Sequence, residues 1–190
     1  MSTPLDPDER KAAILSAALS VFPRYGFKRA TMDDVAREAN LSRPVLYLSY
    51  QNKAAIFASL ATALARRTSE AAEAAWPPGV SFSEGLTAAS LAQHGTMWAL
   101  LKASPHGGDL LEANSSLTSD LGADMDRRFA QLVASRAQGL PCRSTGGSAT
   151  RLGRVVAASL HGIKESAQSE KELHSDIAAF ARLAAAGAEN

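Results

Sequence analysis

The feature that most constrains this chain is the segment 31–50, TMDDVAREANLSRPVLYLSY, where two short helical patterns meet at one turn. Thr31, followed three residues later by Asp34, is typical of a helix that begins at a capping hydroxyl. Asn40 tolerates the left-handed conformation that often ends a helix, and Ser42 is a typical start for the next one. The segment therefore predicts a helix-turn-helix, in which a first helix supports a second, exposed helix.

The second helix of such a motif can enter the major groove of DNA, and its side chains suit that role. Arg43 can donate two hydrogen bonds to a guanine edge, while Pro44 and Val45 are small apolar residues that suit thymine methyl groups. The DNA-facing set that we expect is Thr31, Ser42, Arg43, Pro44, Val45, Tyr47 and Lys53, supplemented by Lys28, Arg29, Leu48 and Ser49. By spacing alone, the alternative is a pair of ordinary amphipathic helices joined by a tight turn.

The distribution of charge agrees with a nucleic-acid-binding head. The whole chain has a net charge of +1, but residues 24–53 carry six Lys or Arg against three Asp or Glu. Residues 54–190 carry twelve against thirteen. A locally basic segment on a nearly neutral body suits contact with phosphates. We therefore predict a DNA-binding domain over residues 1–53 and a larger helical domain over residues 54–190.

Helical periodicity and stop signals continue along the chain, so we expect an all-α protein of about nine helices. The first helix should begin after Asp6 and end at Gly26, with a bend or an early end at Pro23. After the helix-turn-helix, the patterns predict helices over about 53–75, 83–103, 109–114, 121–138, 148–168 and 170–186.

Composition and motifs argue against several classes of protein. Residues 1–10 carry three acids and no apolar run, and no run of 18 apolar residues exists, so neither a signal peptide nor a membrane span is expected. The single Cys142 cannot form an internal disulfide, which favours a cytoplasmic location. The four His have no metal-ligand spacing, and no nucleophile motif or phosphate loop is present. We expect no enzyme activity, no cofactor and no metal site.

Residues 10–60 resemble the TetR family of transcriptional regulators. The residues that carry the resemblance, in order, are Ala17, Phe22, Gly26, Phe27, Thr31, Val35, Ala36, Ala39, Leu41, Ser42, Leu46, Tyr47, Tyr50, Asn52, Lys53, Ile56 and Phe57. The resemblance implies phosphate contacts by Tyr47 and Lys53 and base contacts by residues 43–45. The sequence departs from the family at Asn40, where Gly is usual, and at residues 48–49, where an aromatic residue or His is common.

The resemblance also implies that the larger domain binds a small molecule and dimerises through the last two helices. Small or apolar residues on those helices are compatible with an interface, but they could equally cover the core of their own subunit; they are Ala157, Ala158, Ile163, Ala167, Ile177, Ala181, Ala184 and Ala185. The residues that we expect to line a ligand cavity are His94, Met97, Trp98, Leu101, Met125, Phe129 and His161. A Met or aromatic stripe at helical spacing is also compatible with an ordinary core.

The resulting expectation is a homodimeric repressor that binds a palindromic or near-palindromic double-stranded operator. A small apolar or amphipathic ligand would release it from this DNA. Two alternatives stay open: a DNA-binding regulator whose helical domain binds a protein partner or no ligand, and a helical enzyme or scaffold. The sequence identifies neither the ligand nor the operator nor the regulated genes, and it leaves repression and activation open.

Overall fold

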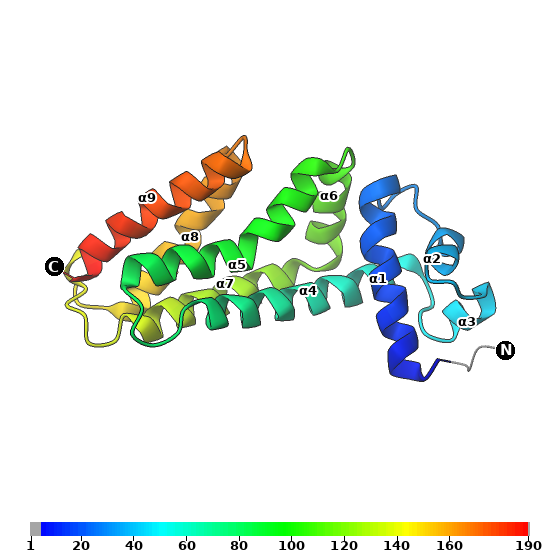
Figure 1. Cartoon of the computed structure of the whole chain (residues 1–190), viewed down its shortest axis with the longest axis horizontal. Coiled ribbons are helices and arrows are strands. Elements are labelled where there is room, and N and C mark those ends of the chain that lie inside the picture. Colours follow the sequence, from blue (N-terminus) through cyan, green and yellow to red (C-terminus); the bar gives the residue numbers. More distant parts are fainter. Residues whose placement is uncertain (1–4, 190) are drawn as a thin grey trace. The chain divides into compact units, whose positions relative to one another are not determined.

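The computed structural model describes residues 5–189, which form nine α-helices, one short 3-10 helix and no strand (Figure 1). This confirms the expected all-α class. The helices are α1 (Pro7–Tyr25), α2 (Met32–Glu38), α3 (Arg43–Tyr47), α4 (Lys53–Ala75), α5 (Phe82–Ala103), α6 (Gly107–Leu117), α7 (Ser119–Arg136), the 3-10 helix η1 (Arg143–Thr145), α8 (Ala149–Ser166) and α9 (Glu170–Glu189).

The N-terminal helices begin and end at the capping residues that the sequence indicated. Asp6 caps α1 with its carboxylate, and Gly26 closes the helix at φ 79°. Thr31 caps α2, and Asn40 leaves the turn after it at φ 59°. Of the two outcomes expected at Pro23, an early end is wrong, because α1 continues for two residues beyond it and a proline in the last turns removes only one helical donor. The bend stays a prediction.

The chain folds into two compact units. The first contains residues 5–64 and 100–119, and the second contains residues 65–99 and 120–189. Helices α4 and α5 each begin in one unit and end in the other. The domain boundary expected between residues 53 and 54 separates a DNA-binding domain from a helical domain by their functions, and it stays a prediction.

Helices α1, α2, α3, α4 and α6 share the core of the first unit. Phe22, Leu46 and Ile56 are among its fully buried side chains, and Leu110 of α6 packs in the same cluster. The residues around the end of α1 also form hydrogen bonds with residues 100–119, the second stretch of sequence in this unit. Ser104 Oγ donates to the Pro23 carbonyl at 2.8 Å. Asp109 Oδ2 accepts the Lys28 backbone N–H at 2.9 Å. Residues 100–119 are therefore an integral part of the unit that carries the helix-turn-helix.

The core of the second unit contains large aromatic and aliphatic side chains. Trp76 and Phe82 pack edge to face with ring centroids 5.1 Å apart, and a Cβ added at Gly85 would collide with the Trp76 indole. Helices α8 and α9 lie side by side (Figure 1). Their residues buried in this core include Ala157, Ala167, Ile177, Ala181 and Ala185. These five therefore cover the core of their own subunit, as the alternative interpretation proposed.

Within residues 5–189, no helix combines the length and the apolar character that a crossing of the bilayer requires.

Candidate nucleic-acid interface

Helix α3 has one buried side and one exposed side. Leu46 is fully buried, and Tyr50 packs partly buried against the core of the first unit. On the other side, Ser42, Arg43 and Pro44 are exposed, while Val45 is half-buried. The two large apolar residues Tyr47 and Leu48 keep 40% and 75% of their surface accessible. A helix that leaves such side chains in water presents a surface suited to a partner.

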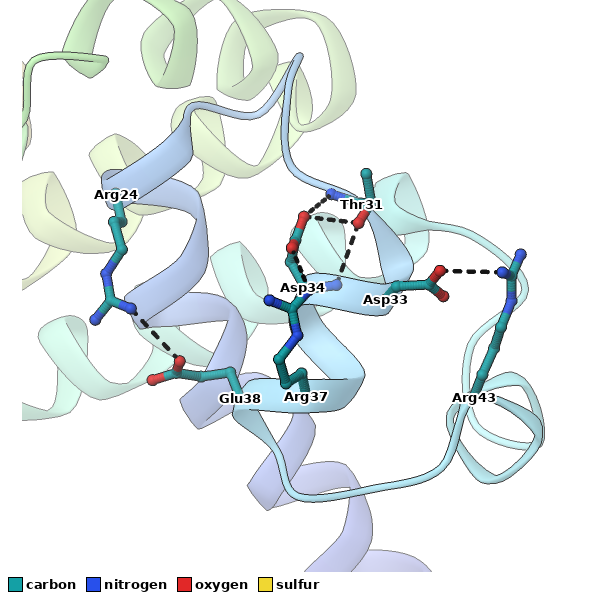
Figure 2. A network of polar contacts seen from close by, with 7 residues as sticks. All are labelled: Arg24, Thr31, Asp33, Asp34, Arg37, Glu38 and Arg43. Atoms are coloured by element: carbon teal, nitrogen blue, oxygen red, sulfur yellow. Dashed lines mark hydrogen bonds and ion pairs between the residues drawn. The ribbon is translucent and has the colours of Figure 1, made fainter.

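Arg43 is held next to α2 by an exposed ion pair. Its Nη1 lies 3.1 Å from Asp33 Oδ2 (Figure 2). Its guanidinium also lies 5.6 Å from the centre of the Tyr47 ring. The side chains of Arg43 and Asp33 are 62% and 54% exposed, so this pair contributes only about 0–1 kcal/mol. Arg43 can therefore exchange Asp33 for a guanine edge at little cost.

The hydroxyl of Thr31 is engaged in the cap of α2. It donates to Asp34 Oδ2 at 2.6 Å and accepts the Asp34 N–H at 3.2 Å (Figure 2). The Thr31 hydroxyl, followed by the Thr31 backbone N–H and the charge of Arg37, lowers the pKa of the Asp34 carboxyl. A phosphate contact through the Thr31 hydroxyl proton would require the bond to Asp34 to break.

Lys53 points into the loop between α1 and α2. Its ammonium donates to the carbonyls of Phe27, Lys28 and Ala30 at 2.8, 2.9 and 2.9 Å, and lies 5.0 Å from the centre of the Phe27 ring. An ammonium has three donors, so these carbonyls use all of them. In this conformation Lys53 fixes the loop that precedes α2, and a phosphate would have to displace one of the carbonyls.

The supplementary residues have mixed surroundings. Lys28 is paired with Glu112 of α6 at 2.7 Å, and that hydrogen bond and charge raise the pKa of the Lys28 ammonium. Arg29 is exposed and makes no ion pair or hydrogen bond among the side chains of residues 5–189. Ser49 Oγ accepts a hydrogen bond from Arg10 Nε at 3.0 Å, which leaves its own proton available to a phosphate. Arg29 and Ser49 thus remain better placed for DNA than Lys28.

Six of the seven residues expected in the ligand cavity belong to the second unit. The rings of His94 and Phe129 lie 5.8 Å apart, Trp98 Nε1 donates to the Lys164 carbonyl at 2.9 Å, and His161 bonds Asp126 at 2.8 Å. Met97 and Met125, also in the second unit, are half-buried. The seventh residue, Leu101, packs instead against the core of the first unit.

One open pocket of about 340 Å³ lies elsewhere in the second unit. It is lined by Trp76, Phe82, Arg136 and the turn 77–80, among others. None of the seven expected ligand residues lines it, so it offers no support for that set.

Sequence reasoning missed the partners of several site residues. No local signal indicates that Asp33 pairs with Arg43 or that Arg10 reaches Ser49, since these contacts join different elements. One missed residue does have a signal. Lys164 falls at helical spacing from the apolar positions that α8 buries, and a charged residue on an apolar face indicates a special role.

The exposed side of α3 carries Arg43 and apolar side chains, and α2, capped by Thr31, precedes it across a tight turn, whereas Ser42 at the start of α3 makes no side-chain capping bond. This arrangement is that of a helix-turn-helix DNA-binding protein. Residues 14–60 match the sequence profile of the bacterial regulatory proteins of the tetR family. This is the N-terminal region that the geometry describes.

Curated relatives agree with this assignment. An HTH-type transcriptional regulator of Bacillus subtilis is 35% identical over 78 residues, which is 41% of each chain. An HTH-type transcriptional repressor of Streptomyces coelicolor is 40% identical over 55 residues, which is 29% of each chain. The chain is therefore matched over less than half the length of these relatives.

Solved structures show the same fold over the rest of the chain. A TetR-family transcriptional regulator from Pectobacterium atrosepticum has a TM-score of 0.66 at 18% identity, covering 96% of this chain and 95% of its own. A TetR-like transcriptional regulator from Rhodococcus has a TM-score of 0.61 at 24% identity, covering 97% and 96%. Residues 14–60 therefore match the tetR family of bacterial regulatory proteins, and the chain as a whole has the fold of these solved TetR-family regulators.

Proposed function

We propose that the protein is a homodimeric repressor that binds a near-palindromic operator and is released from it by a small amphipathic ligand. The observation that carries the DNA-binding part is the exposed side of α3. Ser42, Arg43, Pro44, Tyr47 and Leu48 are all accessible there, although two of them are large and apolar. The helix is short and anchored by the buried Leu46, so it supports these side chains rigidly.

Base and phosphate contacts are assigned from this exposure. Arg43 reads a guanine edge, with Pro44 and Val45 beside thymine methyl groups. Tyr47, Ser49 and the N-terminal amides of α3, which begins after Ser42, approach phosphates. Thr31 and Lys53 act mainly by holding the helix-turn-helix in shape, since both are engaged in internal hydrogen bonds.

The dimer would form through the outer faces of α8 and α9. After their apolar faces are used in the subunit core, these helices still expose Val155 and Leu183 at 49% and 74% of their surface. Ala158 and Ala179 are exposed as well, and small residues allow helices to approach closely. Two such helices from each subunit make a four-helix interface, and its twofold symmetry would match a palindromic operator.

Selection of bound DNA from a random pool tests the DNA-binding part, followed by measurement of affinity by fluorescence anisotropy. We expect a symmetric site whose half-sites lie one helical turn or more apart. Absence of any DNA binding at low salt would refute the proposal. A reporter gene placed behind the selected site then decides between repression and activation.

Ligand control is tested on the same operator fragment. A ligand that binds better to the form with poor DNA affinity must weaken DNA binding by the same coupling energy, typically about 1–3 kcal/mol. Unchanged operator affinity in the presence of a tightly bound ligand would leave a DNA-binding regulator without ligand control.

A further inference from the structure

Polar side chains of α5, α7 and α8 meet in the second unit, where the outer pair, Asp126 and His161, is largely exposed. We name them the Lys164 cluster: His94 of α5, Asp126 of α7, and His161 and Lys164 of α8. The rings of Trp98 and Phe129 adjoin the cluster, through the Lys164 carbonyl and the His94 ring.

The ammonium of Lys164 is poorly satisfied for a partly buried charge. Its hydrogen-bond partner is His94 Nδ1, at a long 3.5 Å, and no carboxylate within residues 5–189 forms an ion pair with it. Burial lowers the pKa of Lys164, while the charges of Asp126 and Glu165 raise it. An ammonium has three donors, so at least two are available to a further acceptor.

The neighbouring ionisable groups do not neutralise this charge. Asp126 Oδ2 already bonds His161 Nε2 at 2.8 Å. Burial, followed by the charges of Lys164 and His161, lowers the pKa of His94 to about 3, so its ring is neutral at pH 7. Because an ammonium only donates, His94 Nδ1 is the acceptor in their contact and His94 Nε2 carries the proton. His94 Nδ1 therefore accepts from one of the three donors of Lys164, and the Nε2–H of His94 points away from the ammonium.

Two further polar groups of α5 are buried without a partner. Ser90 is 0% exposed and Gln93 is 3% exposed, and Ser90 Oγ and Gln93 Nε2 make no hydrogen bond. Ser90 lies four residues before His94, and side chains at that spacing share one face of a helix. A buried polar atom without a partner costs about 1–3 kcal/mol, so each of these two groups favours a further hydrogen-bonding partner.

We propose that the effector is an amphipathic monoanion whose carboxylate is bound by the ammonium of Lys164. Its apolar part would lie against the Trp98 and Phe129 rings, which are 9% and 2% exposed. Met97 and Met125, on the same two helices, are unbranched and can yield to ligands of varied shape. A carboxylate satisfies the ammonium, a neutral ligand leaves it unpaired, and a cation is repelled by it. This inference rests on the proposed function, in that the second unit is taken to bind the effector.

Matched ligands and variants test the inference on the full-length protein. The first set of probes is the carboxylate octanoate, its neutral counterpart 1-octanol and the cation octylammonium. The second set is the carboxylate 2-naphthoate and its neutral counterpart 2-naphthol. Their affinities for the protein are measured by calorimetry. The key variant is Lys164→Met, which keeps the aliphatic stem and leaves the backbone carbonyl to Trp98. Lys171→Met, at an exposed lysine of α9, is the control.

We expect at least one carboxylate to bind more tightly than its neutral counterpart, and octylammonium not to bind. Lys164→Met should weaken that carboxylate by about tenfold or more, as loss of a charge-assisted hydrogen bond does, and leave the neutral probe unchanged. Lys171→Met should change neither. In the wild type, carboxylate affinity should also fall as pH rises through the lowered pKa of Lys164, and this measurement does not depend on how the variant folds.

The inference is overturned if neither carboxylate binds, if the neutral probes bind equally well, or if Lys164→Met leaves carboxylate affinity unchanged. Its failure differs from failure of the proposed function, because operator affinity is measured separately. A carboxylate that binds through Lys164 without weakening operator binding refutes ligand control alone. A neutral compound that releases the operator equally from the wild type and from Lys164→Met refutes the monoanion alone.

Discussion

Replacement of Lys53 separates a role in folding from a role at phosphates. Lys53 donates to three loop carbonyls within 2.9 Å, and its ammonium lies over the Phe27 ring. Lys53→Met keeps the aliphatic stem and removes all of these interactions. The carbonyls of Phe27 and Ala30 are the ones bonded in partly buried surroundings, so most of the loss arises there.

The expected loss follows from these two bonds. A hydrogen bond to a charged group contributes about 1.5–3 kcal/mol, and the freed side chain regains up to about 2 kcal/mol of rotamer entropy. We therefore expect Lys53→Met to lower the free energy of unfolding by about 1–4 kcal/mol in urea titrations at one fixed protein concentration. Lys11→Met is the matched control, because Lys11 is exposed on α1, and its stability should stay within about 0.5 kcal/mol of the wild type.

The salt dependence of DNA binding distinguishes the two roles. Each phosphate contact contributes about 0.9 to the slope of log affinity against log salt. If Lys53 only positions the loop, Lys53→Met lowers affinity but leaves the slope unchanged. A dimer that loses a phosphate contact in each head would lose about 1.8 from the slope. A drop of that size, with stability unchanged, would refute the reasoning.

Three further perturbations test the interface, the core and the assembly. Asp33→Ala should raise operator affinity a few-fold by releasing Arg43, whereas Arg43→Ala should cost about 1–3 kcal/mol and relax the preference at one position per half-site in a binding selection. A uniform loss over all sequences would instead place Arg43 at a phosphate. Gly85→Ala should lower the free energy of unfolding by about 1–3 kcal/mol, because the added methyl group collides with the Trp76 indole. Gly95→Ala, on the same helix but with open space around the added methyl group, should raise it by about 0.5–1 kcal/mol. Urea titrations that give the same change for both variants would contradict this. Leu183→Glu should convert the dimer to monomers in sedimentation velocity, since it places a charge in the expected interface, and an intact dimer would exclude the outer face of α9.

Helix limits were predictable because capping is a local property. The fourth helix was expected over 53–75 and is observed as Lys53–Ala75. Asn52 Oδ1 accepts the Ala55 N–H at 2.9 Å at its start, and two prolines follow soon after its end. The same reasoning failed at Pro23, where helix packing and capping at Gly26 prevailed over the loss of one donor.

Side-chain partners were not predictable, because they depend on contacts between distant segments. Lys28 pairs with Glu112 across 84 positions of the sequence. Lys53 donates to carbonyls that lie between 23 and 26 positions earlier in the sequence. Its place at the start of a helix therefore gives no indication of these partners. Leu101 shares helical spacing with His94 and Met97. However, α5 passes from the second unit into the first between residues 99 and 100, so Leu101 packs against the core of the first unit.

The passage of α5 between the units has a consequence for regulation. His94 and Trp98 lie on this helix in the second unit, and the helix ends at Ala103 in the first unit. The next residue, Ser104, donates to the carbonyl of Pro23 at the end of α1. From His94 to Ala103 the rise of an α-helix spans about 14 Å without a break in its hydrogen bonds. If the proposed ligand shifts His94, it therefore acts on a helix whose last residues belong to the unit of the helix-turn-helix, as α4 also passes between the units, whereas the connection between α6 and α7 is interrupted at Thr118.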